Sequence, residues 1–229
     1  MTGKQLILFD IDGTLIDSGG AGIRALNLAF SEHFGIDIAF NGISMAGKTD
    51  MQIVKEALKL HGIGNNNGEV ELVTGRYLGI LRSEINNPHR TVNPGVYGIL
   101  EHLKAEGYPL GLLTGNIEGG ARLKLSPFGL NRYFPFGAFG SDHEDRDRLL
   151  PIAINRFPVS GEAVKPGDCV IIGDTPRDVR CAHVHGARCI GVATGPFTMN
   201  ELEDSGADLT IGDLREKEKI LEFLDDGRR

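Results

Sequence analysis

Two aspartates two residues apart, Asp10 and Asp12, are well placed for chemistry because they directly follow the apolar run Leu6–Phe9. In an extended chain, side chains two residues apart point the same way, so both carboxylates can serve one site. Such a pair can bind a hard cation such as Mg²⁺. It can also divide the work of a nucleophile and a general acid and base. A polar turn is the simpler interpretation, since Asp and the following Gly13 are ordinary turn residues.

Polar residues also end two other apolar runs. Thr114 follows residues 109–113, and Asp174 follows residues 169–173. Short, continuous apolar runs are typical of strands that are buried on both faces of a parallel sheet. Because the carboxyl ends of parallel strands lie at one edge of a sheet, we expect Asp10, Thr114 and Asp174 to converge on one site.

A site of this composition suits phosphoryl transfer to a carboxylate. The attacking carboxylate and the phosphate repel each other, so positive charge must offset the repulsion. Asp10, Asp174 and Asp178 are candidate ligands for a Mg²⁺ ion that supplies this charge. The expected partner is a small phosphorylated metabolite.

The phosphate itself needs hydrogen-bond donors. Thr114 offers a hydroxyl, and the backbone N–H groups near Gly115 and Asn116 stand where a helix is expected to begin. Helix starts present N–H groups that bind phosphate oxygens. These three residues are therefore the predicted phosphate cradle.

Strands and helices alternate through most of the chain, which predicts an α/β fold with a doubly wound parallel sheet. Residues 16–92 break the alternation, because they contain helical patterns at 50–61 and 69–86 and no clear buried strand. We interpret them as an insert after the first strand. The predicted division is a core domain of residues 1–15 and 93–229 and an all-helical domain of residues 16–92.

The segment DIDGT, followed by Leu15 and Asp17, resembles the first motif of the haloacid dehalogenase-like (HAD) superfamily in its phosphatase form. The longer stretch DIDGTLIDSGGAG and the later GKTD resemble the phosphoglycolate-phosphatase-like hydrolases more specifically. The resemblance implies a Rossmann-like core with a helical cap domain inserted after the first strand. It also implies a hydrolase that cleaves a small phosphate monoester with Mg²⁺ through an aspartyl phosphate.

The resemblance also assigns roles to residues of this chain. Asp10 is expected to be the nucleophile, and Asp12 the general acid and base whose backbone carbonyl binds the metal. Thr114 is expected to bind phosphate, and Asp174 and Asp178 to serve the metal.

The sequence departs from the family pattern at its basic residue. That pattern has a basic residue, usually Lys, before the strand that ends at Asp174, but no Lys occurs between Lys124 and Lys165. Arg146 and Arg148 are the candidates to replace it. Helix placement favours Arg146, in the loop nearer the strand ends, with Arg148 as the alternative. An Arg supplies the charge as a planar fork instead of a point.

Gly42–Thr49 matches the P-loop pattern GxxxxGK(S/T) and follows a weak strand candidate at Ile36–Phe40. A P-loop nucleotide-binding protein is therefore an alternative. Phosphate-cradling loops are Gly-rich, however, whereas Ile43 and Met45 are apolar. The P-loop interpretation also leaves the DIDGT segment without a role.

In the phosphatase interpretation the same segment has another use. Gly47, Lys48 and Thr49 lie on the helical insert and can reach over the site to contact the substrate. Lys48 can then pair with an anionic substituent such as a carboxylate. An exposed Lys at a helix start is the simpler interpretation.

Other members of the superfamily are also alternatives. Dehalogenases of this kind lack the second Asp, so Asp12 disfavours them. A sugar-phosphate mutase shares the motif and stays an alternative. A phosphonate hydrolase also stays an alternative, although the insert Lys of that class forms a Schiff base and the local sequence around Lys48 differs. A catalytically idle binding module is disfavoured by the intact Asp10, Asp12, Thr114 and Asp174.

Composition narrows the remaining classes. A chain of 229 residues suits one large or two small domains. A net charge of −7 without a basic cluster argues against nucleic-acid binding. The three cysteines are an odd number and are typical of core residues in a reducing compartment. The N-terminal apolar run is too short for a signal peptide or a membrane span. We expect a cytoplasmic monomer or homodimer.

Overall fold

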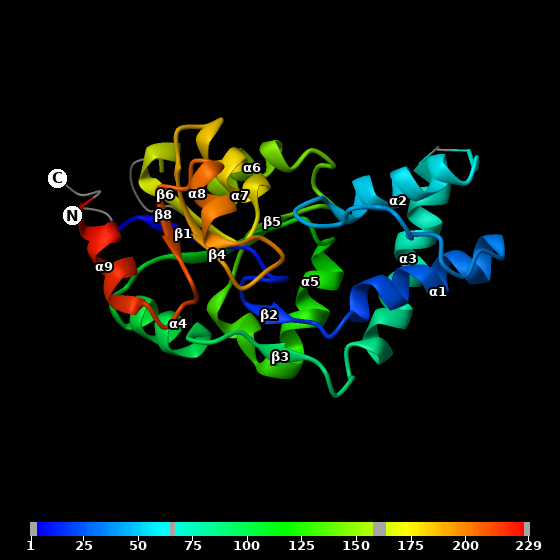
Figure 1. The fold of residues 1–229 in the computed structure, drawn as a ribbon, viewed down its shortest axis with the longest axis horizontal. Helices are drawn as coiled ribbons and strands as arrows, with labels where there is room; N and C mark the ends of the chain where they lie inside the picture. The colour runs from blue at the N-terminus through cyan, green and yellow to red at the C-terminus, as the bar shows by residue number, and fades with distance from the viewer. Residues whose placement is uncertain (1–3, 65–66, 158–163, 227–229) are drawn as a thin grey trace.

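The computed structural model describes residues 4–64, 67–157 and 164–226. It contains a six-stranded sheet in the order β5-β4-β1-β6-β7-β8, and every neighbouring pair in it is parallel. Figure 1 shows helices on both faces of this sheet, so the predicted doubly wound α/β fold is confirmed. Its strands are β1 (Leu6–Phe9), β4 (Leu110–Thr114), β5 (Gly137–Phe139), β6 (Cys169–Gly173), β7 (Arg188–Val192) and β8 (Leu209–Ile211).

The helices follow the expected alternation with the strands. Within the described ranges they are α1 (Ala21–Phe34), α2 (Asp50–Leu60), α3 (Asn67–Glu84), α4 (Val96–Ala105), α5 (Glu118–Leu125), α6 (Leu149–Arg156), α7 (Pro176–His183), α8 (Met199–Asp204) and α9 (Lys217–Asp226). The same ranges also contain four short 3₁₀ turns, at Ser126–Phe128, Leu130–Tyr133, Arg146–Arg148 and Pro166–Asp168. Among the described residues, no helix has both the length and the apolar character needed to cross a membrane.

Strand β1 lies in the middle of the sheet order, between β4 and β6, and all four of its side chains are buried. Ile7 and Phe9 belong to the hydrophobic cluster that contains residues of α4, α5 and α9. Leu6 and Leu8 belong to the opposite cluster, with residues of α6 and α7. Alternate residues of a strand point to opposite faces, so an uninterrupted apolar run is what a doubly covered strand requires.

Helices α1, α2 and α3, which we call the helical unit, lie to one side of the sheet in Figure 1. They share a hydrophobic cluster of their own, which includes Phe30, Val54 and Leu81. The short strands β2 (Ile16–Asp17) and β3 (Thr91–Val92) pair antiparallel where the chain enters and leaves this unit. This β2–β3 pair lies at the predicted boundaries of the insert, but the division into two domains stays a prediction.

The weak strand candidate at Ile36–Phe40 is wrong. The structure has turns there, and Asn27 Oδ1 accepts a hydrogen bond from Phe40 N. Phe40 packs edge-on against Phe30, with 5.2 Å between the ring centroids, while Ile38 is exposed. The alternation of apolar residues here therefore reflects the packing of the Phe40 ring into the helical unit and does not indicate a strand.

Candidate active site

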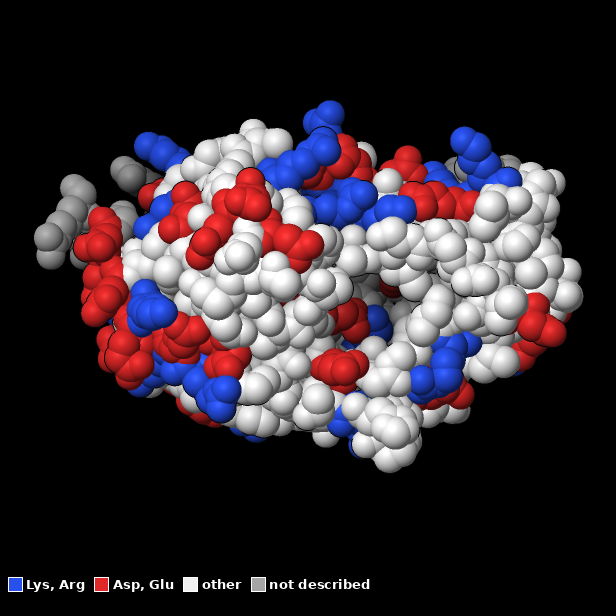
Figure 2. Space-filling model, viewed as in Figure 1, with Lys and Arg blue, Asp and Glu red and all other residues white. Residues whose placement is uncertain are grey.

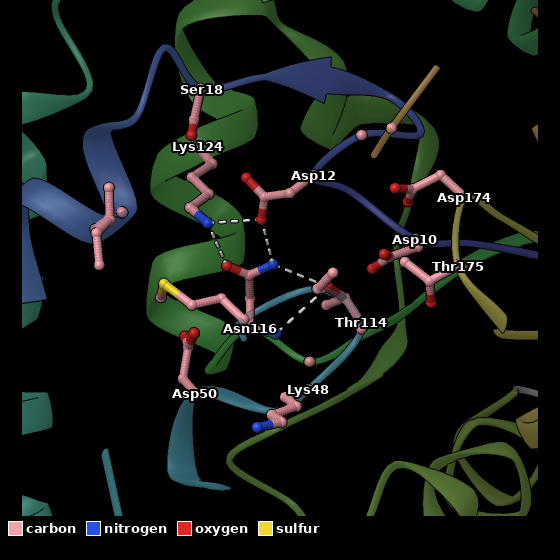
Figure 3. A pocket seen from close by; sticks show the side chains of 18 of the residues that line it. Asp10, Asp12, Ser18, Lys48, Asp50, Thr114, Asn116, Lys124, Asp174 and Thr175 are labelled. Carbon is pink, nitrogen blue, oxygen red and sulfur yellow. Dashed lines mark hydrogen bonds and ion pairs between the residues drawn. The ribbon is translucent and has the colours of Figure 1, made fainter. Parts of the chain in front are cut away.

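The polar strand ends meet as the topology requires. Strands β4, β1 and β6 are neighbours, so Asp10 and Asp174 follow adjacent strands and Thr114 ends the third. These residues line a cavity of about 450 Å³ between the sheet edge and the helical unit. Figure 2 shows a hollow in this part of the surface, with acidic and basic side chains inside it. Figure 3 shows Thr114, Asp10 and Asp174 side by side at one end.

Three buried carboxylates form an acidic cluster at this end. Each of Asp10, Asp174 and Asp178 offers an oxygen, and these oxygens lie within 4.8 Å of one another. Burial raises the pKa of Asp10 to about 6. The charge of Arg146 lowers this pKa, and the charge of Asp178 raises it. Burial and the charges of Asp10 and Asp178 also raise the pKa of Asp174 well above its ordinary value. A hard divalent cation bound by oxygen ligands would relieve this repulsion, so the residues fit Mg²⁺.

The Asp174 carboxylate packs closely against two glycines on separate loops, where a larger residue would clash with it. A Cβ atom at Gly13 would lie 2.2 Å from Asp174 Oδ2, and one at Gly195 would lie 1.7 Å from the same atom. Gly13 also has a positive φ of 81°, which only glycine adopts readily. On the other side, Thr14 Oγ1 donates a hydrogen bond to Asp174 Oδ1 at 2.9 Å. The Gly-Thr pair after Asp12 therefore positions a carboxylate from another strand.

Of the two candidate arginines, Arg146 reaches the cluster and Arg148 is exposed. Both lie in one 3₁₀ turn, whose N-cap residue Asp145 accepts a hydrogen bond from Asp147 N. Arg146 Nη2 lies 3.3 Å from Asp10 Oδ1 and donates to Asp178 Oδ1. The guanidinium is buried, and the Asp10 and Asp178 charges outweigh the cost of burial and raise its pKa.

Asp178 is already engaged by protein donors. Its Oδ2 accepts hydrogen bonds from Thr175 N at 3.0 Å and from Thr175 Oγ1 at 2.8 Å. The bond from Thr175 N to Asp178 is the carboxylate half of a capping box at the start of α7. Because Arg146 occupies the other oxygen, Asp178 orients the arginine as well as adding charge to the cluster.

A hydrogen-bonded network links Thr114 to Asp12. Asn116 Nδ2 donates to Thr114 Oγ1 and to Asp12 Oδ2, each at 2.9 Å. Lys124 Nζ donates to Asp12 Oδ2 and to Asn116 Oδ1, each at 2.6 Å (Figure 3). Burial opposes the charge of Lys124, but Asp12 and Asp50 outweigh it, so the pKa of Lys124 is raised.

Lys124 is a site residue that the sequence analysis missed. It lies on α5 beside the buried Ala121 and Leu125, on the inward face of the helix. The available signal was a Lys at an inward position of an amphipathic helix that begins just after Asn116. Helix periodicity reveals such a position, but it does not identify the partner across the loop.

The GKT segment of the insert packs against the loops of the sheet edge. Gly47 O accepts a hydrogen bond from Arg146 Nη1 at 3.2 Å, and Thr49 Oγ1 donates to Glu144 O at 2.7 Å. A Cβ atom at Gly115 would lie only 2.1 Å from Lys48 O. The backbone of this segment thus forms part of the cavity wall.

The ammonium of Lys48 is paired inside the helical unit. Its Nζ lies 2.5 Å from Glu56 Oε2, and Figure 3 shows it pointing away from Asp10. Turns and extended chain, with no strand among the described residues 36–49, precede α2. A P-loop follows a strand, so the structure does not support one at Gly42–Thr49.

A comparison with family models matches residues 7–192 to the haloacid dehalogenase-like hydrolase family. Among curated proteins, the phosphoglycolate phosphatase 1 of Pseudomonas aeruginosa is 27% identical over 218 residues, which cover 93% of this chain and 78% of that protein. A probable phosphatase of Dickeya dadantii, IndB, is 25% identical over 202 residues, which cover 87% of this chain and 86% of that protein.

Solved structures share the fold. A predicted phosphatase from Clostridium acetobutylicum aligns over 96% of this chain and 99% of its own, with a TM-score of 0.73 and 21% identity. The protein CbbY from Rhodobacter sphaeroides, solved with phosphate, aligns over 93% of this chain and 96% of its own, with a TM-score of 0.74 and 18% identity.

Proposed function

Because the chain belongs to the haloacid dehalogenase-like hydrolase family, we propose that it is a Mg²⁺-dependent phosphatase that hydrolyses a small phosphate monoester through an aspartyl phosphate. The names of several relatives make phosphoglycolate the reference substrate. The observation that carries the proposal is the buried cluster of Asp10, Asp174 and Asp178, with Arg146 against it and Asp12 beside it.

Asp10 and Asp12 divide the reaction between them. An oxygen of Asp10 attacks phosphorus, the bond from phosphorus to the ester oxygen breaks, and Asp12 gives its proton to the departing alcohol. Asp12 then takes a proton from water while the water oxygen attacks phosphorus. Inorganic phosphate leaves, and the Asp10 carboxylate is restored.

The remaining groups bind and orient the phosphate. Arg146 lies against Asp10 and offers N–H donors and charge to the phosphoryl oxygens. The Thr114 hydroxyl and the backbone at Gly115 and Asn116 cradle the same group. Asn116 also links Thr114 to Asp12, so the phosphate site and the proton donor are held by one side chain.

Asp10, Asp174, Asp178 and the backbone carbonyl of Asp12 are the residues that would hold Mg²⁺. When bound, the ion neutralises charge on the phosphate and the carboxylates. Gly47 and Lys48 of the insert line the cavity, and together with Thr49 they are the residues of the insert that would contact the substrate.

Phosphate release from a panel of monoesters, beginning with phosphoglycolate, tests this proposal. We expect turnover in Mg²⁺ and its loss in EDTA, with recovery when Mg²⁺ is added back. Product analysis should show free alcohol and inorganic phosphate, whereas an isomeric phosphate ester would indicate a mutase. Full activity in EDTA would contradict the metal assignment.

A further inference from the structure

The cavity continues past Asp12 into the helical unit, well beyond the groups that serve the phosphate. We call this part the leaving-group end. Its polar side chains come from three helices, and its apolar wall comes from α1 and α2; the residues are Lys124, Tyr77, Asp50, Ile23, Leu26 and Ile53. A leaving group that fills this end must suit these side chains.

The hydroxyl of Tyr77 is a buried polar group that lacks a partner. Tyr77 is 1% exposed, and its Oη has no hydrogen-bond partner among the described residues. Burial, then the charges of Asp50 and Asp12, raise the pKa of Tyr77 well above its ordinary value, so the phenol keeps its proton. Buried hydroxyls are nearly always hydrogen-bonded, and Tyr77 is one of the residues that line the cavity, which points to a ligand as the partner of this hydroxyl.

Lys124 provides a second donor that faces the same space. An ammonium has three N–H donors, and the bonds to Asp12 and Asn116 use two of them. A Cβ atom built on Gly22 would lie 3.4 Å from Lys124 Nζ and 3.9 Å from Tyr77 Oη. Both donors therefore border one small space above Gly22, in the first turn of α1.

The charges around this space favour a neutral group over an anion. Lys124 is the cation here, and it already faces the carboxylates of Asp12 and Asp50. Asp50 accepts a hydrogen bond from Ile117 N at 2.9 Å, which holds it at the cavity wall. Even with Asp12 protonated for its role as the acid, a substrate carboxylate would add a second negative charge to that of Asp50 beside one ammonium. A hydroxyl can accept from Lys124 or Tyr77 and donate to Asp50.

We propose that the leaving-group end recognises an uncharged hydroxyl group, so that the substrates are phosphate monoesters of polyols and Tyr77 is a specificity-determining residue. This inference rests on the proposed phosphatase function. It departs from the reference substrate in one respect, because the alcohol released carries a neutral hydroxyl in place of a carboxylate.

The test compares glycerol phosphate with propyl phosphate, which has the same carbon chain without the two free hydroxyls. We expect the wild type to have the higher kcat/KM for glycerol phosphate. Tyr77→Phe should lower the ratio of the two values about three- to tenfold, the size of one neutral hydrogen bond. Its melting temperature should equal or exceed that of the wild type, because an unsatisfied buried hydroxyl is removed. Tyr97→Phe is the control, since Tyr97 donates to Phe128 O away from the cavity.

Gly22→Ala tests the same space without removing a donor. Its methyl group would make ordinary contacts with Lys124 and Tyr77, and Ala favours the helix, so the variant should fold. It should lower the same ratio, because the methyl occupies the space for the hydroxyl.

The outcomes separate this inference from the proposed function. Failure to release phosphate from any ester would overturn both. Release from all esters with no preference for glycerol phosphate over propyl phosphate would overturn this inference alone. So would a higher kcat/KM for phosphoglycolate than for glycerol phosphate, or a ratio that Tyr77→Phe and Gly22→Ala leave unchanged.

Discussion

The two ends of the cavity differ in how their carboxylates and hydroxyls are satisfied, although a buried donor at the phosphate end, Arg146 Nε, also lacks a partner among the described residues. At the phosphate end each carboxylate has a protein partner: Arg146 bonds to Asp178 and pairs with Asp10, and Thr14 donates to Asp174. At the leaving-group end the Tyr77 hydroxyl is buried without a bond to any described residue. Paired groups are held in place for chemistry, whereas an unmet donor is satisfied by what binds.

The phosphate end is expected to carry out the reaction, and the leaving-group end to recognise the alcohol. Changes at the phosphate end should affect every substrate alike, because all of them carry the same phosphoryl group. Changes at the leaving-group end should affect substrates according to the alcohol. The following variants test that distinction, from the largest expected effect to the smallest.

Asp10→Asn should have the largest effect. The amide cannot form the aspartyl phosphate, so kcat should fall by about 10⁴-fold or more on every monoester. Steady-state phosphate release on two unrelated esters measures it. A loss confined to one ester would contradict the placement of Asp10 at the reacting phosphorus.

Arg146→Lys should have an intermediate effect at the same end. The lysine keeps the charge but loses the fork that reaches Asp10 and Asp178 together, so kcat should fall about 10²-fold on all esters. Arg148→Lys is the matched control, because Arg148 is exposed in the same turn. Equal losses in the two variants would mean that the turn, and not the Arg146 guanidinium, is responsible.

Asp50→Asn should change stability in a pH-dependent way. Burial is the main reason that the pKa of Asp50 is raised from 3.8 to about 6 in the folded protein. Between these values the unfolded chain has released the proton and the folded protein has kept it, so this group's contribution to the unfolding free energy falls as pH rises. A shift of about two units corresponds to about 3 kcal/mol.

Urea unfolding at several pH values measures this effect. The unfolding free energy of Asp50→Asn, relative to the wild type, should rise by about 3 kcal/mol between pH 4 and 7. Asp204→Asn changes an exposed carboxyl and serves as the control. A difference between Asp50→Asn and the wild type that does not vary with pH would contradict the burial of an acid at this position.

The sheet could be predicted from sequence because its strands are short, continuous apolar runs. The runs at 6–9 and 169–173 coincide with β1 and β6, and parallel topology places their carboxyl ends at one edge. For the same reason Asp10, Thr114 and Asp174 could be expected to meet. The helix that is expected to begin near Gly115 and Asn116 is α5, which starts at Glu118.

Contacts between elements could not be predicted in this way. Lys124, Tyr77 and Gly195 gain their roles from neighbours far away in the sequence, and periodicity reports only which face of an element is buried. Lys48 was singled out by its motif, but its ammonium pairs with Glu56 on α2. Motif spacing identifies the backbone of a site more readily than the direction of its side chains.

The central claim is that the phosphoryl group is transferred to Asp10 and then released by a water that Asp12 activates. Asp12→Asn with p-nitrophenyl phosphate isolates the second step, because nitrophenolate leaves without help from an acid. We predict a rapid burst of nitrophenolate approaching one equivalent per protein molecule, followed by turnover slowed about 10²- to 10⁴-fold. Mass spectrometry of the acid-quenched protein should find the phosphate on Asp10. Phosphate on another residue, or slow release without a burst from unmodified protein, would contradict the account.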